Sequence, residues 1–124
     1  MKILSVDDSR TVRIIVRNAF KRFDCEIIEA GNGAEGLEKV TLKPDLVLLD
    51  ITMPIVDGVT MLEKMHADPE LRDIPVIMLT AEGQKTMTDR ATALGSRGYL
   101  VKPFTAEALV QQVSTIVPLR EKAA

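Results

Sequence analysis

The chain is 124 residues long, 46% hydrophobic and 27% charged, which is enough for one compact domain with its own core. Its 16 Lys and Arg against 18 Asp and Glu give a net charge of −2, and this balance argues against a general nucleic-acid binder. The single cysteine, Cys25, excludes a scaffold built on intrachain disulfides. No apolar window is long enough for a signal peptide or a membrane span. We therefore expect a cytoplasmic single-domain protein that binds neither nucleic acid nor membrane.

Five short apolar runs punctuate the chain and are the candidate strands. They cover residues 3–6, 27–30, 46–49, 76–79 and 99–101. The runs at 46–49 and 76–79 are apolar at every position, which is typical of parallel strands covered by helices on both faces.

Between these runs, apolar residues recur three or four positions apart, which is the spacing of one helix face. The first stripe is expected to line roughly three turns of one helix; it consists of Val12, Ile15, Val16, Ala19, Phe20 and Phe23. The later stripes are Leu37 and Val40; Val59, Leu62 and Met65; Met87, Ala91 and Leu94; and Ala106, Leu109, Val110, Val113 and Val117. Thr105 is placed to cap the last of these helices. The Lys and Arg residues of the first helix, Arg13 among them, are expected to form a solvated face.

The alternation predicts an α/β domain, a doubly wound (βα)5 fold around a five-stranded parallel sheet. We expect the domain to cover residues 1–118, with 119–124 as a short, frayed C-terminal tail and no output domain after it.

Polar residues follow four of the five expected strands. Asp7 and Asp8 follow the first, Asp50 the third, Thr80 the fourth and Lys102 the fifth, whereas the second ends in Ala30-Gly31-Asn32. In open α/β sheets, ligands bind beyond the carboxyl ends of the strands. A strand order of 2-1-3-4-5, as in flavodoxin-like folds, makes the four strands with polar ends neighbours, and it therefore predicts a single site.

Three carboxylates at adjacent strand ends repel one another, which raises their pKa values and destabilises the fold. A hard divalent cation such as Mg²⁺ relieves this repulsion, because it prefers oxygen ligands. Lys102 adds a positive charge and Thr80 a hydroxyl donor, so the set suits an incoming phosphoryl group. A carboxylate held there can attack phosphorus and form an acyl phosphate.

Four motifs give the chain a family resemblance over essentially its whole length. They are Val6-Asp7-Asp8-Ser9-Arg10; Leu48-Leu49-Asp50-Ile51-Thr52-Met53-Pro54 with Asp57-Gly58; Thr80-Ala81; and Tyr99-Leu100-Val101-Lys102-Pro103-Phe104. Because these motifs occur in this order and at these strand ends, the chain resembles the receiver domains of two-component response regulators.

The resemblance implies a role for each matched residue. Asp50 would be the phosphoacceptor; Asp8 would bind Mg²⁺ (or Mn²⁺) directly and Asp7 largely through water. The main-chain carbonyl of Thr52 would be a further ligand. Thr80 and Lys102 would contact the phosphoryl oxygens, and the Lys102-Pro103 bond would be cis. Gly58 and Pro103 would be structural.

The same resemblance assigns the switch. Tyr99 would swing inward as Thr80 moves toward the phosphoryl group, whereas the plainer interpretation is an edge-strand aromatic whose hydroxyl reaches water. Thr52 and Glu82 would tune the phosphoryl lifetime. The output surface would combine the helix around 87–94, the strand at 99–101 and the helix at 106–117.

The resemblance implies that the protein is a signalling switch activated by phosphorylation, with a histidine kinase as the donor of the phosphoryl group. The protein would not be a conventional enzyme. The segments Ser9-Arg10-Thr11-Val12-Arg13 and Gly95-Ser96-Arg97-Gly98-Tyr99 favour the chemotaxis (CheY-like) type, whose target would be a flagellar motor switch or another motility protein. A phosphorelay shuttle would carry the same site. We expect a monomer, with dimerisation on activation as an alternative.

Two other classes of protein are alternatives: a small phosphatase with an aspartyl nucleophile, and an electron carrier on the same fold. A phosphatase of the haloacid dehalogenase type wants a second acid two residues after its aspartyl nucleophile, where this chain has Thr52. A flavodoxin-like electron carrier needs a phosphate loop after the first strand, where Asp7 and Asp8 would repel the FMN phosphate.

Overall fold

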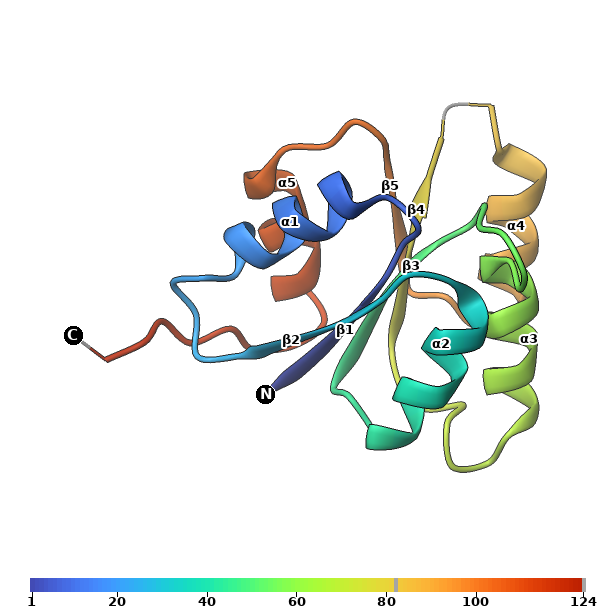
Figure 1. Cartoon of the computed structure of the whole chain (residues 1–124), viewed down its shortest axis with the longest axis horizontal. Coiled ribbons are helices and arrows are strands. Elements are labelled where there is room, and N and C mark those ends of the chain that lie inside the picture. The colour runs from blue at the N-terminus through green and yellow to red at the C-terminus, as the bar shows by residue number, and fades with distance from the viewer. Residues whose placement is uncertain (82, 124) are drawn as a thin grey trace.

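The computed structural model describes residues 1–81 and 83–123, and within them five strands alternate with five α-helices (Figure 1). The elements are β1 (Lys2–Val6), α1 (Arg10–Ala19), β2 (Glu26–Ala30), α2 (Gly33–Lys39), the short 3₁₀ helix η1 (Val40–Leu42), β3 (Leu46–Asp50), α3 (Gly58–Ala67), β4 (Val76–Thr80), α4 (Lys85–Ala93), β5 (Gly98–Val101) and α5 (Ala106–Ser114). The expected (βα)5 alternation is confirmed.

The strands form one parallel sheet in the order β2-β1-β3-β4-β5, as expected from the polar strand ends. Figure 1 shows α1 and α5 covering one face of the sheet and α2, α3 and α4 covering the other. The register pairs Val6 with Leu49 and Asp50 with Leu79. The loops that follow β1, β3 and β4 therefore leave the sheet side by side at one edge.

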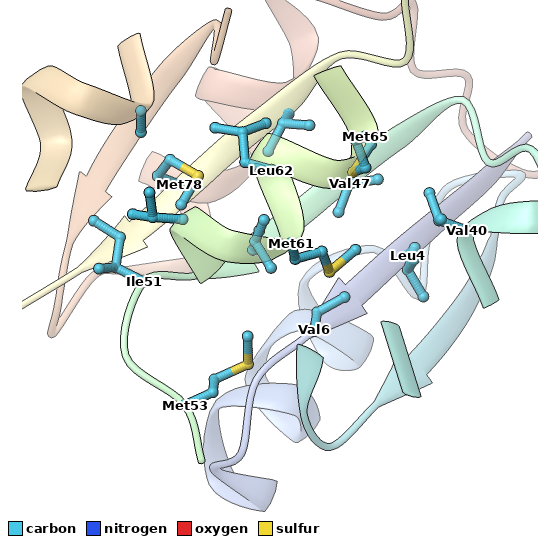
Figure 2. Packing of buried hydrophobic residues seen from close by; sticks show 14 of the residues in the cluster. Leu4, Val6, Val40, Val47, Ile51, Met53, Met61, Leu62, Met65 and Met78 are labelled. Carbon is cyan, nitrogen blue, oxygen red and sulfur yellow. The ribbon is translucent and has the colours of Figure 1, made fainter. Parts of the chain in front are cut away.

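A separate apolar core fills each side of the sheet, because successive strand residues point to opposite faces. In β1, Ile3 packs toward α1 and α5, while Leu4 and Val6 pack toward α2 and α3. Every residue of β3 and β4 is buried, as expected from their uninterrupted apolar runs. Figure 2 shows the core on the side of α2, α3 and α4, where Met61 and Met65 of α3 pack against the sheet near Met78, and Met53 joins them from the loop after β3.

Side-chain caps fix where most helices begin. Ser9 accepts the N–H of Val12 at the start of α1, and Asp57 accepts that of Thr60 at the start of α3. The predicted Thr105 cap is confirmed by its bond from the N–H of Ala108. Among the helices of residues 1–81 and 83–123, none is long and apolar enough to cross a membrane.

Two sequence expectations for α1 are wrong. The helix ends at Ala19, so Phe20 and Phe23 lie beyond it, although both are buried in the core beside α5. Ile15, expected on the buried stripe, is 37% exposed and lines an open groove with Phe104. Apolar spacing predicts the average direction of burial, but the packing of α5 decides which positions are covered.

Three other stripes also extend past their helices. Val40 begins the 3₁₀ helix η1, Leu94 follows the end of α4 and Val117 follows the end of α5, yet all three pack against the cores. Apolar spacing therefore located the buried residues correctly in these segments, but it did not indicate where helical hydrogen bonding stops.

The C-terminal segment was expected to be frayed from residue 119 onward, but residues 119–122 are held in place by the rest of the fold. The N–H of Asp24 donates to the carbonyl of Arg120 at 2.7 Å, and the N–H of Lys122 donates to that of Arg22 at 2.9 Å. Leu119 packs against the core between the sheet and α1 and α5. These contacts anchor residues 119–122 beside the loop that follows α1.

Candidate functional site

Three carboxylates meet at the carboxyl edge of the sheet. Asp7 and Asp8 follow β1 and Asp50 ends β3, and one carboxylate oxygen from each lies within 4.8 Å of the other two. Asp7 is fully buried and Asp50 is nearly so, whereas Asp8 is exposed. The parallel register of β1 and β3 brings these acids together, as the sequence predicted.

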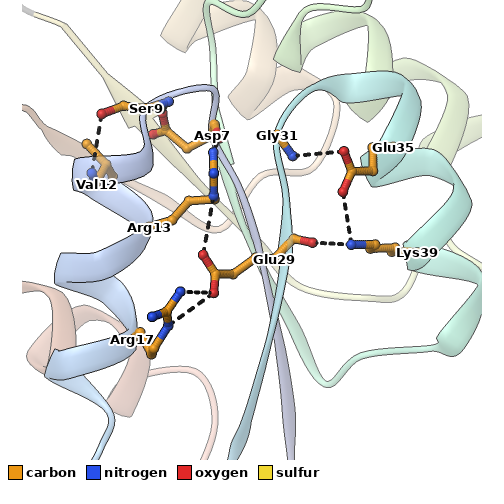
Figure 3. A network of polar contacts seen from close by, with 9 residues as sticks. All are labelled: Asp7, Ser9, Val12, Arg13, Arg17, Glu29, Gly31, Glu35 and Lys39. Atoms are coloured by element: carbon orange, nitrogen blue, oxygen red, sulfur yellow. Dashed lines mark hydrogen bonds and ion pairs between the residues drawn. The ribbon is translucent and has the colours of Figure 1, made fainter.

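Asp7 is held rigidly by its neighbours. Its Oδ1 accepts the N–H of Ser9 at 2.8 Å, and its main-chain carbonyl accepts a hydrogen bond from the guanidinium of Arg13 at 2.6 Å. Figure 3 shows that Arg13 also reaches Glu29 on β2, which in turn pairs with Arg17. The loop that carries Asp7 and Asp8 is thereby tied to the edge strand.

Sequence reasoning placed Arg13 on a solvated face, and it missed this contact. The one signal was Glu29, a charged residue within the otherwise apolar residues Ile27, Ile28 and Ala30 of the second strand. An acid at such a position indicates a cationic partner from a neighbouring element, and α1 supplies one.

Lys102 brings a positive charge to the three acids. Its Nζ lies 2.9 Å from Asp7 Oδ2 and 3.2 Å from Asp50 Oδ1. The Lys102-Pro103 peptide bond is cis, as expected. Burial lowers the pKa of Lys102, but its contacts with Asp7 and Asp50 more than offset this, so that its pKa is raised above the ordinary value.

The pKa of Asp50 is raised to about 6. Burial is the largest cause, and the Asp7 carboxylate adds to it; Lys102 opposes both. The predicted crowding of acids is therefore present at Asp50, where burial and the neighbouring carboxylates favour the protonated form.

The donor set fits a hard divalent cation. Three carboxylates supply only oxygen atoms, and the buried Asp7 Oδ2 has the Lys102 ammonium 2.9 Å away as its partner. Mg²⁺ prefers such oxygen ligands and tolerates water in its remaining positions, which the exposed side of Asp8 leaves open. Asp7, Asp8 and Asp50 are the residues that would hold it.

Thr80 and Thr52 lie beside the acids but have other partners in this structure. Thr80 is buried at the end of β4, and its hydroxyl donates to the carbonyl of Ala81 at 3.3 Å. Thr52 lies exposed in the loop after β3, and its hydroxyl accepts from Gln84 Nε2 at 2.7 Å. Sequence reasoning did not single out Gln84, because a glutamine next to a helix start carries no motif.

Tyr99 lies on β5, half exposed at 51%, on a groove of about 400 Å³ between β5 and α4. Thr80 lines the same groove, so the two proposed switch residues share one cavity. Glu82, expected to tune the phosphoryl lifetime, lies outside the described residues.

Gly58 and Pro103 occupy constrained positions. A Cβ on Gly58 would lie 2.0 Å from the main-chain oxygen of Asp50, so only glycine permits this approach of the loop to the end of β3. Pro103 forms the cis bond after Lys102 and lines an apolar groove with Ile15 and Phe104.

Comparison with known proteins agrees with this geometry. The sequence model of the response regulator receiver domain matches residues 3–114. The chain is 37% identical over 120 residues to chemotaxis protein CheY1 of Helicobacter pylori, covering 94% of this chain and 97% of that protein. It is 36% identical over 120 residues to sporulation initiation phosphotransferase F of Bacillus subtilis, covering 96% and 95%. The crystal structure of Vibrio cholerae chemotaxis protein CheY4 superimposes with a TM-score of 0.86 at 29% identity, covering 94% of this chain and 98% of that one.

Proposed function

The chain belongs to the response regulator receiver family, and on that premise we propose that Asp50 accepts a phosphoryl group from a histidine kinase and that this changes the affinity of the protein for a partner. The observation that carries the proposal is the position of the Asp50 carboxylate. It lies at a strand end, 3.2 Å from the Lys102 ammonium and within 4.8 Å of two further acids. A nucleophile, a counter-charge and oxygen ligands for a metal are thus in one place.

In the proposed transfer, a carboxylate oxygen of Asp50 attacks phosphorus as the bond from phosphorus to the donor's imidazole nitrogen breaks. The product is an acyl phosphate, and the electron pair of the broken bond stays on the imidazole. Lys102 would move from the Asp50 carboxylate to a phosphoryl oxygen. Mg²⁺ held by Asp7, Asp8 and Asp50, with the Thr52 carbonyl as a further ligand, would neutralise charge on the carboxylates and the phosphoryl group; Mn²⁺ has the same ligand preference.

For the switch, we propose that Thr80 exchanges its bond to the Ala81 carbonyl for one to the phosphoryl group. This would open space in the groove that Thr80 shares with Tyr99, and Tyr99 would move into it. Phosphorylation would thereby favour one of two packings of α4 and β5 that exist beforehand. The output face would be formed by α4, β5 and α5, with Thr52 and Glu82 tuning the lifetime of the acyl phosphate.

As the process controlled, we propose chemotaxis or motility, with a protein target such as a flagellar motor switch. The support is the match to a chemotaxis protein of Helicobacter pylori along 97% of that protein's length. We also propose that the receiver domain spans residues 1–118 and acts in the cytoplasm. The match to the sporulation phosphotransferase supports a second candidate, a phosphorelay shuttle.

The first test is the intact mass of the protein after incubation with acetyl phosphate, with and without Mg²⁺. We expect a gain of one phosphoryl group that requires Mg²⁺, is removed by hydroxylamine and is absent in Asp50→Asn. An adduct of the same size in Asp50→Asn would reject Asp50 as the acceptor. No adduct in the unaltered chain would reject the receiver chemistry.

A second test follows Tyr99, the one tyrosine of a chain without tryptophan, by its intrinsic fluorescence. Mg²⁺ with fluoroberyllate, which mimics a phosphoryl group on a carboxylate, should protect this half-exposed ring from a soluble quencher. Calorimetry shows whether the protein is saturated with fluoroberyllate. If quenching is unchanged in the saturated protein, Tyr99 is an ordinary edge-strand aromatic without a switch role.

A further inference from the structure

The side chain of Gln84 joins the two loops that border Asp50. Its Oε1 accepts the N–H of Ala81 at 2.7 Å, and its Nε2 donates to Thr52 Oγ1 at 2.7 Å. Ala81 follows Thr80 at the end of β4, while Thr52 follows the end of β3, the strand that carries Asp50. One amide group therefore ties the segment that must move in the proposed switch to the loop beside the phosphoacceptor.

Among the α-helices of the described residues, only α4 begins without a side-chain cap. Ser9, Asn32, Asp57 and Thr105 each accept a main-chain N–H at the beginnings of α1, α2, α3 and α5. Gln84 stands at the same position before α4, but its side chain makes no capping bond, and the first turn contains no acid. Its amide binds the two loops instead, so this end of α4 lacks the side-chain cap that the other four α-helices have.

The donors that a phosphoryl group would need at the end of β4 are both engaged. The Thr80 hydroxyl donates to the Ala81 carbonyl, and the Ala81 N–H donates to Gln84. Asp50 pairs with Leu79 in the neighbouring strand, one residue before Thr80. A phosphoryl group on Asp50 offers new acceptor oxygens close to this strand end. If Thr80 and Ala81 turn toward it, the bond from Ala81 to Gln84 must lengthen or break.

We propose that Gln84 is a positioning residue that holds the end of β4 and the start of α4 in the unphosphorylated arrangement, and that release of its bridge to Ala81 and Thr52 is a step of activation. The inference rests on the proposed function, and it adds the contact that holds the unphosphorylated arrangement in place. A bridge present in only one of two arrangements shifts the equilibrium toward that arrangement by its own free energy. Its loss therefore favours the activated arrangement.

The test compares the unaltered chain with Gln84→Met, which has a side chain of similar length and no amide. Each is titrated with fluoroberyllate at saturating Mg²⁺ by isothermal titration calorimetry, and each is labelled with acetyl phosphate to give an initial rate by intact mass. We expect Gln84→Met to bind fluoroberyllate about three- to tenfold more tightly, the range expected for loss of hydrogen bonds at a partly exposed site. The labelling rate should rise in the same direction.

The matched control is Lys85→Ala, the neighbouring residue, whose exposed side chain pairs with Asp89 alone among the described residues. It should leave the affinity unchanged. A merely structural role for Gln84 would lower the affinity of the Met variant through loosened loops, and a tighter complex is the readout that separates the two.

Each remaining outcome overturns the inference in a distinguishable way. Equal affinity of Gln84→Met and the unaltered chain would reject the bridge as a restraint on activation. Weaker binding by Gln84→Met would mean that Gln84 only supports the structure of the loops around Asp50 and does not restrain activation. If the unaltered chain binds no fluoroberyllate and takes no phosphoryl group, the proposed function itself fails and the role of Gln84 fails with it.

Discussion

The ammonium of Lys102 lies 3.2 Å from a carboxylate oxygen of Asp50, across the intervening strand β4. The same ammonium is 2.9 Å from Asp7 on the far side of Asp50. One cation from the loop after β5 thus balances two buried acids from the ends of β1 and β3. This arrangement explains why the fold tolerates buried acids before a metal or a phosphoryl group arrives.

The first prediction concerns pH. The pKa of Asp50 is raised from 3.8 to about 6, so the Asp50 carboxylate binds a proton more tightly in the folded chain than in the unfolded chain. The contribution of Asp50 to stability is therefore most favourable below about pH 4, falls as pH rises to about 6 and stays low above that, a loss of roughly 3 kcal/mol. We expect metal-free Asp50→Asn to gain this much relative to the unaltered chain between about pH 4 and about pH 7. Urea denaturation in the presence of EDTA measures it, and parallel pH curves for the two proteins would contradict it.

The second prediction concerns Lys102→Ala. Removal of the ammonium leaves Asp7 Oδ2 buried beside Asp50 without its counter-charge, so the metal-free protein should lose about 3 kcal/mol of stability. Mg²⁺ should restore most of this, because it supplies positive charge at the same place. Melting temperatures with and without Mg²⁺ test both statements. Equal metal-free stability of the variant and the unaltered chain would show that the pair is not needed.

The third prediction concerns Gly58→Ala. The added Cβ would lie 2.0 Å from the main-chain oxygen of Asp50, which is backbone and cannot swing aside. We expect a loss of about 3 kcal/mol or more, together with weaker Mg²⁺ binding, since the Asp50 strand end must shift. Gly31→Ala is the matched control, because its Cβ would meet only flexible side chains, at 3.7 Å and beyond. Similar denaturation midpoints for the two variants would count against this role of Gly58.

The fourth prediction concerns Ile55, in the loop after β3. Ile55 is 79% exposed and has a φ of 71°, a left-handed conformation that a β-branched residue adopts at a cost. Asparagine tolerates this conformation, so Ile55→Asn should stabilise the protein by about 1 kcal/mol. Ile55→Val keeps the β-branch and should change little. Chemical denaturation of both variants checks the difference, and a destabilised Ile55→Asn would show that the isoleucine side chain makes a needed contact.

The amino-acid pattern by itself was sufficient for the fold and for the location of the acids. The apolar runs at 46–49 and 76–79 are short and uninterrupted because β3 and β4 are covered on both faces. Five polar residues end a strand or come soon after one, and a parallel sheet places all such ends at one edge; they are Asp7, Asp8, Asp50, Thr80 and Lys102. This reasoning needs only local periodicity and the topology that it implies.

Only the tertiary structure decided which side chains pair with one another. The spacing in α1 predicts a buried Ile15 and a solvent-exposed Arg13, yet Arg13 is engaged at the acid loop and Ile15 is 37% exposed. Gln84 reaches Thr52 across 32 positions of sequence. Such contacts depend on how loops and neighbouring helices are placed in space, and local sequence periodicity does not predict that placement.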